Sequence, residues 1–345
     1  MKQIEIAIRC AASTEKGFGN FNRCLILSEE LRKRKYKILF LIDNDLQIIH
    51  ELTKRKFQYF VVSNFRSINK EASFIIDLLN KKNLSFLILD SRERGEILSK
   101  KISTSDARVI LLDDAWVNEA WVDIIINGTM IKQYQKYKKL NINAKIFVGT
   151  KYFIINKNFL KNKKMVKEIK KKSKYRIVIS MGGSDPYGLT FKVLDSICSL
   201  ENVHIRVILG PLMKVNTRQR EYEKKHISFI ESPKSIWNEF KKSDLVISNA
   251  GNTLFELAAQ SIPTICIPVI EHQVPYAKFF HTNGFAINLG YWKNVKNKDI
   301  GKNVIKLLKN TDKRKKMSSK GNKIIDGKGL FRVIKIIEFF TKKLT

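Results

Sequence analysis

The chain has 345 residues, 44% of them hydrophobic, a composition that fits an ordinary globular protein. This length is more than one hydrophobic core usually serves, so two domains are expected. The 65 basic and 32 acidic residues give a formal net charge of +33, which indicates attraction to nucleic acid, anionic lipid or phosphorylated ligands without choosing among them. Two runs concentrate this charge, 161–174 and 309–320, and a solvated surface is the simplest interpretation of both.

Several classes of protein are excluded at this stage. No apolar run approaches the roughly 20 residues of a membrane helix, and no signal peptide opens the chain, so a cytoplasmic protein is expected. Contact between its basic surface and an anionic membrane is left open. No HExxH, EF-hand loop or Cys/His cluster predicts a metal, and no nucleic-acid reading motif accompanies the charge, so neither partner is expected. The cysteines lack CxxC spacing and are expected to be buried free thiols: Cys10, Cys24, Cys198 and Cys266.

Short apolar strands alternate with helix-like stretches through the first half of the chain. The expected strands are 4–9, 37–42, 58–62, 84–89, 108–112 and 123–126, and the expected helices are 21–33, 48–55 and 68–81. This alternation predicts a parallel sheet wrapped on both faces. Polar residues follow several strands, where ligands of such sheets bind: Asp90, Asp113, Asp114 and Asn127.

A Lys- and Asn-rich segment, 157–174, interrupts this pattern and is predicted to be a basic linker. A second alternating series follows, with a helix at 188–199 and strands at 175–180, 203–209, 226–230, 245–248, 265–267 and 286–289. The predicted fold class is therefore α/β, with two doubly wound, Rossmann-like domains whose mainly parallel sheets face each other across a cleft. The predicted domains are 1–156 for sugar binding and catalysis and 175–345 for nucleotide binding.

The most informative stretch is 244–263, which predicts a buried strand, a polar turn and a helix stopped by Pro263. A turn that opens a helix offers free N–H groups and a positive dipole end to a phosphate. Glu256 lies one helical turn after Thr253 and could accept hydrogen bonds from sugar hydroxyls. The candidate nucleotide-binding residues here are Asn249, Gly251, Asn252, Thr253 and Glu256. The alternative, equally compatible with the spacing, is a capping box between Thr253 and Glu256.

Other candidates depend more on context. The turn that contains Gly182, Gly183 and Ser184 would let the backbone approach a phosphate. His272 and Gln273 could donate to phosphate or sugar, although an isolated histidine more often packs or caps. In the first half, the loop before a helix offers Gly17, Gly19 and Arg23 to a substrate. It matches neither GxGxxG nor a Walker A loop, so no nicotinamide cofactor or ATPase is expected. Asp90, Asp113 and Asp114 are candidate acids or bases, or turn residues.

Taken together, these segments resemble the UDP-sugar hydrolases of pseudaminic acid biosynthesis and their spore-coat-polysaccharide relatives. Those proteins are similar to the lipid-II-forming N-acetylglucosaminyltransferase, a GT-B enzyme. The matching segments span most of the chain: 9–13, 17–25, 113–114, 123–127, 149–159, 181–186, 249–263, Gln273 and 288–290.

The resemblance implies a UDP-sugar substrate and no cofactor. Diphosphate would lie near Gly182, Gly183, Asn252 and Thr253, ribose on Glu256, and uracil against the backbone near 229–230, including Ile230. In the resembled hydrolases, water attacks the anomeric carbon and UDP leaves, and a histidine in a Gly-x-Gly-His loop helps to activate that water.

The departures from this pattern concern the catalytic half. Asn20 replaces the loop histidine, Ala11 replaces an acid, and Ser91 and Arg92 replace a His-Tyr pair. Asparagine cannot take a proton at neutral pH, so the base must be supplied by another group, and Asp90 and Asp114 are the candidates beside Asn20. The leading hypothesis is a UDP-amino-sugar hydrolase of surface-glycan, pseudaminic-type acid biosynthesis. The alternatives are a GT-B UDP-sugar glycosyltransferase and a catalytically impaired nucleotide-sugar-binding relative.

Overall fold

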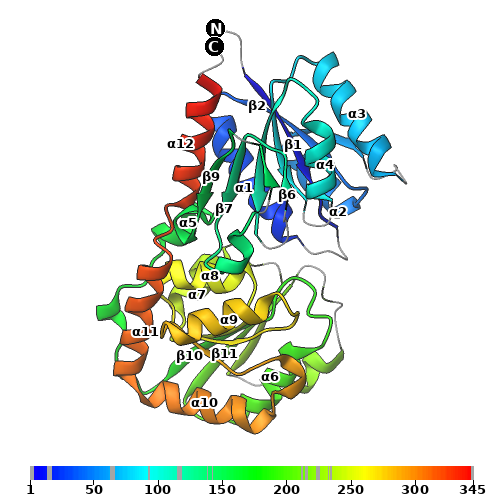
Figure 1. Cartoon of the computed structure of the whole chain (residues 1–345). Coiled ribbons are helices and arrows are strands. Elements are labelled where there is room, and N and C mark those ends of the chain that lie inside the picture. Colours follow the sequence, from blue (N-terminus) through cyan, green and yellow to red (C-terminus); the bar gives the residue numbers. More distant parts are fainter. Residues whose placement is uncertain are drawn as a thin grey trace. The chain divides into compact units, whose positions relative to one another are not determined.

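The computed structural model divides the chain into two compact units (Figure 1). Unit 1 comprises Met1–Asn156 and Lys328–Thr345, and unit 2 comprises Lys157–Gly327. The residues that the structure describes are 4–13, 18–62, 67–91, 94–114, 119–137, 139–141, 143–210, 213, 217–222, 226–231, 233 and 235–342.

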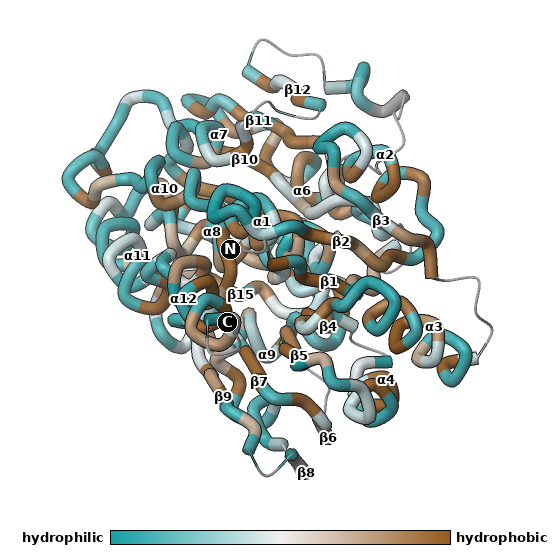
Figure 2. The backbone as a smooth tube through the Cα atoms, turned by 90° about the horizontal axis from the view of Figure 1, so that it is seen from above, coloured by the Kyte–Doolittle hydropathy of each residue, from teal (hydrophilic) through white to brown (hydrophobic). Residues whose placement is uncertain are grey.

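Unit 1 is built on a seven-stranded, wholly parallel sheet with the strand order β3-β2-β1-β4-β5-β7-β9. Its strands are almost continuously apolar because helices cover both faces of the sheet, and β1 and β2 are mostly brown in Figure 2. The strands are β1 (Glu5–Cys10), β2 (Lys37–Ile42), β3 (Gln58–Val61), β4 (Phe86–Asp90), β5 (Arg108–Asp113), β7 (Ile124–Asn127) and β9 (Lys145–Val148). A separate short pair joins β6 (Glu119–Ala120) to β8 (Lys139–Leu140).

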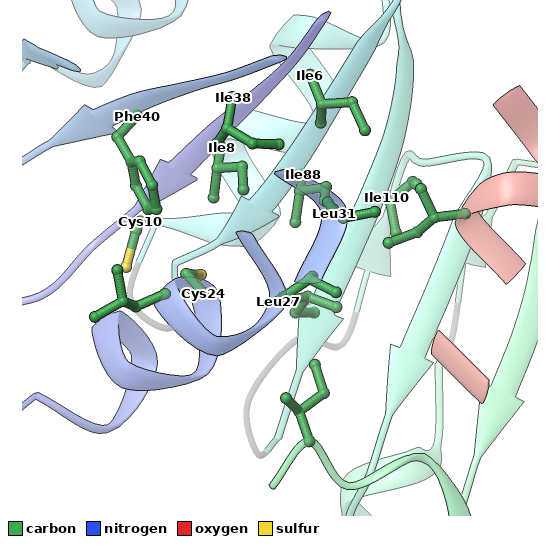
Figure 3. Close-up of a cluster of buried hydrophobic side chains, with 14 of the residues drawn as sticks. Ile6, Ile8, Cys10, Cys24, Leu27, Leu31, Ile38, Phe40, Ile88 and Ile110 are labelled. Carbon is green, nitrogen blue, oxygen red and sulfur yellow. The ribbon is translucent and has the colours of Figure 1, made fainter. Parts of the chain in front are cut away.

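Two hydrophobic clusters lie on the two faces of this sheet, because successive strand side chains point to opposite sides. Ile8 belongs to the cluster that α1 and α12 cover, and Ala7 to the cluster that α3 and α4 cover. Figure 3 shows Ile8 and Ile88 of the sheet on the same side as Leu27 of α1. The helices of unit 1 are α1 (Gly19–Lys33), α2 (Leu46–Lys54), α3 (Ile68–Lys81), α4 (Gly95–Ile102) and α12 (Gly329–Lys342), with 3-10 turns η1 (Lys132–Gln135) and η2 (Thr150–Tyr152).

Unit 2 repeats the design with a six-stranded parallel sheet in the order β12-β11-β10-β13-β14-β15. Its strands are β10 (Tyr175–Ser180), β11 (Val203–Leu209), β12 (Ile227–Glu231), β13 (Leu245–Asn249), β14 (Thr264–Ile267) and β15 (Ala286–Asn288). Its helices are α5 (Lys157–Lys161), α6 (Leu189–Ile197), α7 (Ile236–Lys242), α8 (Asn252–Gln260), α9 (Gln273–Thr282), α10 (Asn297–Lys309) and α11 (Thr311–Ile324), with η3 (Val166–Glu168), η4 (Thr217–Tyr222) and η5 (Trp292–Asn294). The lysine-rich α11 is largely teal in Figure 2.

The unit boundaries correct the predicted domains at two places. The chain does divide at Asn156, but α12 belongs to unit 1, because Leu330, Val333 and Ile337 are buried in the cluster that contains Ile8. The second correction concerns the predicted linker 157–174, which is part of unit 2.

The packing of that segment explains why it is not a linker. Phe159 packs against Trp237 and Phe240, with ring centroids 6.0 and 6.4 Å away. Lys164, expected on a solvated surface, is 5% exposed and lies 3.7 Å from a carboxylate oxygen of Asp244. Its lysines outnumber its buried groups, so composition alone resembles that of a connection between domains.

Other predictions are confirmed or corrected in detail. The strands predicted at 37–42, 175–180 and 203–209 are confirmed without change, whereas α4 and β9 were not predicted. Three cysteines are buried free thiols, but Cys198 is half-buried. Among the described residues, no helix is long and apolar enough to cross a membrane.

Candidate functional site

The sheet of unit 2 has one topological switch point, where β11 and β13 flank β10. Ligands of doubly wound sheets bind outside the carboxyl ends of the strands at such a point. Two turns follow these strand ends, one containing Gly182 and Gly183 after β10, the other running from Asn249 to Thr253 after β13. The structure therefore brings together the two glycine-containing turns that the sequence singled out.

The side chain of Asn249 holds these two turns together. Its Nδ2 donates to the carbonyl oxygen of Met181 (3.1 Å), and its Oδ1 accepts from the backbone N–H of Gly251 (3.2 Å). Gly182 has a φ of +102°, a conformation that favours glycine. Gly210, which follows β11, presses against the carbonyl oxygens of Gly182 and Gly183 so closely that any side chain would collide.

Replacing Gly182 by alanine is expected to weaken nucleotide binding rather than unfold unit 2. A Cβ there would lie 2.6 Å from Nδ2 of Asn249, so the Asn249–Met181 hydrogen bond must break or the turn must shift. Positive φ adds a cost of about 1–2 kcal/mol for a residue with a Cβ. Calorimetric titration with UDP should show at least a tenfold weaker affinity. Gly183→Ala, whose Cβ meets nothing within 4 Å, is the matched control and should bind normally.

The start of α8 is open to an anion. Gly251 occupies the N-cap position, and no side chain caps the helix. The outward face of its first turn carries Asn252, Thr253 and Glu256, while Leu254, Phe255 and Leu257 are buried. The alternative of a capping box is thus wrong, because Thr253 lies inside the helix and Glu256 is too far along it.

The neighbouring helix α6 differs in this respect. Asp185 accepts hydrogen bonds from the backbone N–H groups of Leu189 (2.9 Å) and Thr190 (2.7 Å), so a carboxylate already occupies its N-terminus. A phosphate at the switch point would therefore meet the N–H groups of α8 and not those of α6. Neither Asp185 nor Gly210 was predicted as a site residue, although an aspartate just after a glycine turn and a glycine at a strand end were visible in the sequence.

Glu256 has an unusual environment for an acid. It is half-buried, and no hydrogen bond or ion pair to its side chain is found in the described part of the chain. Burial raises the pKa of its carboxyl group to about 8. Such a group would gain by exchanging hydrogen bonds with ligand hydroxyls, because nothing in its own unit supplies them.

The remaining predicted residues of unit 2 lie around this centre. Ser184 is exposed in the glycine turn, and His272 is the N-cap residue of α9. Gln273 is buried, its Oε1 accepting from Val269 N–H (3.0 Å), so it holds the turn before α9 in place. Ile230 is half-buried near the carboxyl end of β12, two strands away from β10.

In unit 1, α1 brings a cation onto two strand-end acids. Arg23 donates to both carboxylate oxygens of Asp90, through Nε (2.9 Å) and Nη2 (2.7 Å), and its Nη1 lies 3.4 Å from Oδ2 of Asp114. Burial raises the pKa of Asp90, although Arg23 opposes this shift. The Asp90 side chain is 1% exposed and that of Asp114 19% exposed, so Asp114 is the acid that solvent or a ligand can reach.

A small pocket opens beside this ion pair. Arg23 and Asp114 line it together with Gly128, Thr129 and Tyr152. Next to it, Asp113 accepts hydrogen bonds from the Tyr137 hydroxyl group (2.8 Å) and Asn127 Nδ2 (3.3 Å). Tyr137 was not predicted, because no spacing relates it to β5, and its pKa is raised by burial and by Asp113.

The predicted loop before α1 is described only in part. Gly19 is the exposed first residue of α1, and Asn20 is half-buried one helical turn before Arg23. Gly17 and Arg92 lie outside the described residues. No group of three or more metal-ligating side chains occurs among the residues that are described.

With this geometry established, comparison with known proteins places the chain. Residues 144–329, more than half of the chain, match the glycosyltransferase family 28 C-terminal domain. The chain belongs to this glycosyltransferase family. The match includes all of unit 2, and therefore both turns that Asn249 joins and the open start of α8 in this family 28 domain.

Comparisons over the full length agree. The chain is 25% identical to the spore coat polysaccharide biosynthesis protein SpsG of Bacillus subtilis (strain 168) over 348 residues, covering 97% of this chain and 98% of SpsG. The crystal structure of MurG from Acinetobacter baumannii superposes with a TM-score of 0.73 at 14% identity, over 97% of this chain and 99% of MurG. CalG4, the calicheamicin glycosyltransferase, gives 0.72 at 11% identity over 100% of both chains.

These likenesses confirm the predicted GT-B fold, with two parallel, Rossmann-like sheets. The expectation that the two domains face each other across a cleft stays a prediction. So do the roles of the individual site residues.

Proposed function

We propose that this protein transfers a sugar from a UDP-sugar to a hydroxyl group of an acceptor during the synthesis of a surface polysaccharide. The observation that carries the proposal is the uncapped start of α8 at the β10/β13 switch point, with Asn252, Thr253 and Glu256 facing outward. The family supports a nucleotide-sugar donor, and the name of SpsG supports a role in polysaccharide biosynthesis.

The donor half of the reaction takes place in unit 2. The N–H groups at the start of α8 and the turn of Gly182 and Gly183 bind the diphosphate, and Glu256 bonds the ribose hydroxyl groups. Uracil lies against the backbone near Ile230. When the bond between the anomeric carbon and the diphosphate oxygen breaks, negative charge grows on UDP, and the positive end of the α8 dipole stabilises it.

The acceptor half belongs to unit 1. The acceptor oxygen forms the new bond to the anomeric carbon and gives its proton to Asp114, the more accessible of the two acids beside Arg23. Asp90 is engaged by two N–H groups of Arg23, so it holds that side chain in place and is a weaker candidate for the base.

Transfer is favoured over hydrolysis by the comparisons. The matching family is one of glycosyltransferases, and the name of SpsG does not describe a hydrolase. Asn20 agrees with this assignment, because an asparagine in the loop before Arg23 cannot activate water as a base.

UDP release, measured with and without an acceptor, tests the proposal. Purified protein is incubated with UDP-N-acetylglucosamine and other UDP-sugars, first alone and then with a panel of hydroxyl-bearing glycan acceptors. Release that requires the acceptor is the expected result. Equal release without acceptor would show hydrolysis, and UDP binding without turnover would show a binding protein.

Replacing Asn20 by histidine is expected to raise acceptor-independent UDP release. A base in this loop could deprotonate water, an effect commonly worth about 10²–10⁴-fold, and at least a tenfold gain is expected here. Asn20→Ala is the control and should leave the slow background release unchanged. If the histidine variant releases UDP no faster than that control, the loop does not reach the reacting sugar.

A further inference from the structure

The exposed face of α12 carries a regular pattern of aromatic and basic side chains. Phe331, Lys335, Phe339 and Lys342 are spaced by four, four and three residues, and Lys328 precedes them by three. At 3.6 residues per turn, these five positions fall on one narrow stripe of the helix. We call them the Lys-Phe stripe.

The two phenylalanines of the stripe are exposed although α12 has a well-packed opposite face. Phe331 is 39% exposed and Phe339 is 56% exposed. On the other side, Val333, Ile334 and Ile337 are fully buried in the core of unit 1. The helix therefore has enough apolar side chains to fold onto the sheet without the stripe, and the stripe is left for something else (Figure 1).

The charge around the stripe is positive. Its lysines are exposed, and the one acid beside them within the described residues of α12, Glu338, lies 3.6 Å from a guanidinium nitrogen of Arg34. Tyr36 bonds Thr341 (2.8 Å), which brings the basic turn after α1 to the same end of the helix. Exposed rings between lysines suit the boundary between the headgroups and the acyl chains of an anionic bilayer.

We propose that the Lys-Phe stripe is a peripheral binding surface for anionic lipid bilayers. The two rings insert among the acyl chains, and the lysines contact the lipid phosphates. This inference goes beyond sugar transfer and does not depend on it.

The position of the stripe connects it to the pocket of unit 1. Gly329 at the start of α12 packs against the backbone of Phe153, and Arg332 Nη1 donates to the carbonyl oxygen of Lys151 (2.9 Å). The segment that begins with Tyr152 lines the pocket beside Arg23. A bilayer bound along α12 would thus lie close to the pocket that we assign to the acceptor.

Vesicle flotation with the full chain tests this surface. The protein is mixed with vesicles of phosphatidylcholine alone or of phosphatidylcholine with phosphatidylglycerol, and binding only to the second kind is expected. The variant Phe331→Ser/Phe339→Ser should bind at least tenfold more weakly. Lys335→Gln/Lys342→Gln should lose roughly fivefold for each lysine.

Matched variants separate the stripe from general charge and stickiness. Lys302→Gln/Lys306→Gln removes the same charge from the exposed face of α10, and Leu46→Ser removes an apolar side chain that is 81% exposed on α2; both should bind like the natural protein. Equal losses in the α10 variant, or normal binding by the phenylalanine variant, would overturn the proposal. So would light scattering that shows a dimer which the phenylalanine variant converts to a monomer, without any vesicle binding. UDP affinity and thermal unfolding of each variant confirm that it is folded.

Discussion

Replacing Glu256 by alanine is expected to weaken UDP binding by roughly 10- to 100-fold, the loss that follows from removing hydrogen bonds to a charged group. Glu256 lies on the outward face of α8, one turn from Thr253, with no partner of its own in the described residues. The variant removes nothing that holds the helix together, so affinity should change while the unfolding temperature stays close to its original value. Calorimetric titration with UDP measures the change.

The assignment to ribose can be tested separately from the loss of charge. The natural protein should bind 2′-deoxy-UDP less tightly than UDP, whereas Glu256→Ala should bind the two ligands alike, because its ribose contact is already gone. Glu271→Ala removes an exposed carboxylate just before α9 and should not discriminate against the deoxy ligand differently from the natural protein. An alanine variant that still distinguishes the ligands as before would place the ribose elsewhere.

The nucleotide half of the site could be read from the sequence because it is local. A buried strand, a polar turn and a helix follow one another between 244 and 263, and the structure has β13, the turn and α8 there. The alternation of such units fixes a parallel sheet, and the carboxyl ends of parallel strands meet at one edge. Gly182 and Asn249 were therefore predicted at the same edge before their contact was known.

The helix caps could not be read in the same way. Thr253 and Glu256 have the spacing of a capping box, but the helix begins at Asn252, with Gly251 as its N-cap residue. Which residue starts a helix depends on backbone angles that several polar residues in succession would allow. Asp185, three residues after Gly182, took the capping role on α6 without any clear signal in the sequence.

Long-range packing was the second source of error. α12 has an apolar face that could cover either sheet, and order along the chain favours the one just completed. It packs instead on the sheet of unit 1, where Leu330 and Ile337 join a cluster with Ile8. Similarly, Arg23 and Asp90 were both candidates, for substrate and for base, but a contact between residues 67 positions apart is not visible in spacing.

Replacing Arg23 by methionine is expected to destabilise unit 1 by about 3–5 kcal/mol near neutral pH, the cost of leaving a buried charge without its partner. Asp90 is 1% exposed and would lose two N–H donors at 2.9 and 2.7 Å, keeping only the thiol of Cys24 (3.3 Å) among the printed contacts of its side chain. Chemical unfolding measures the loss. Arg34→Met, which breaks only surface ion pairs to Glu30 and Glu338, should cost about 0–1 kcal/mol.

The pH dependence distinguishes this ion pair from simple loss of packing. Burial already raises the pKa of Asp90 in the folded protein, and removing Arg23 raises it further. A folded state with a raised carboxyl pKa binds more protons than the unfolded chain above the ordinary aspartate range, so the variant should regain stability as the pH falls from 8 towards 5. Arg23→Met/Asp90→Asn removes the titrating group, so it should be more stable than the single variant at pH 8 and should lack this pH response. A double variant no more stable than the single one would mean that Arg23 acts by filling space, because only a buried charge makes its absence so costly.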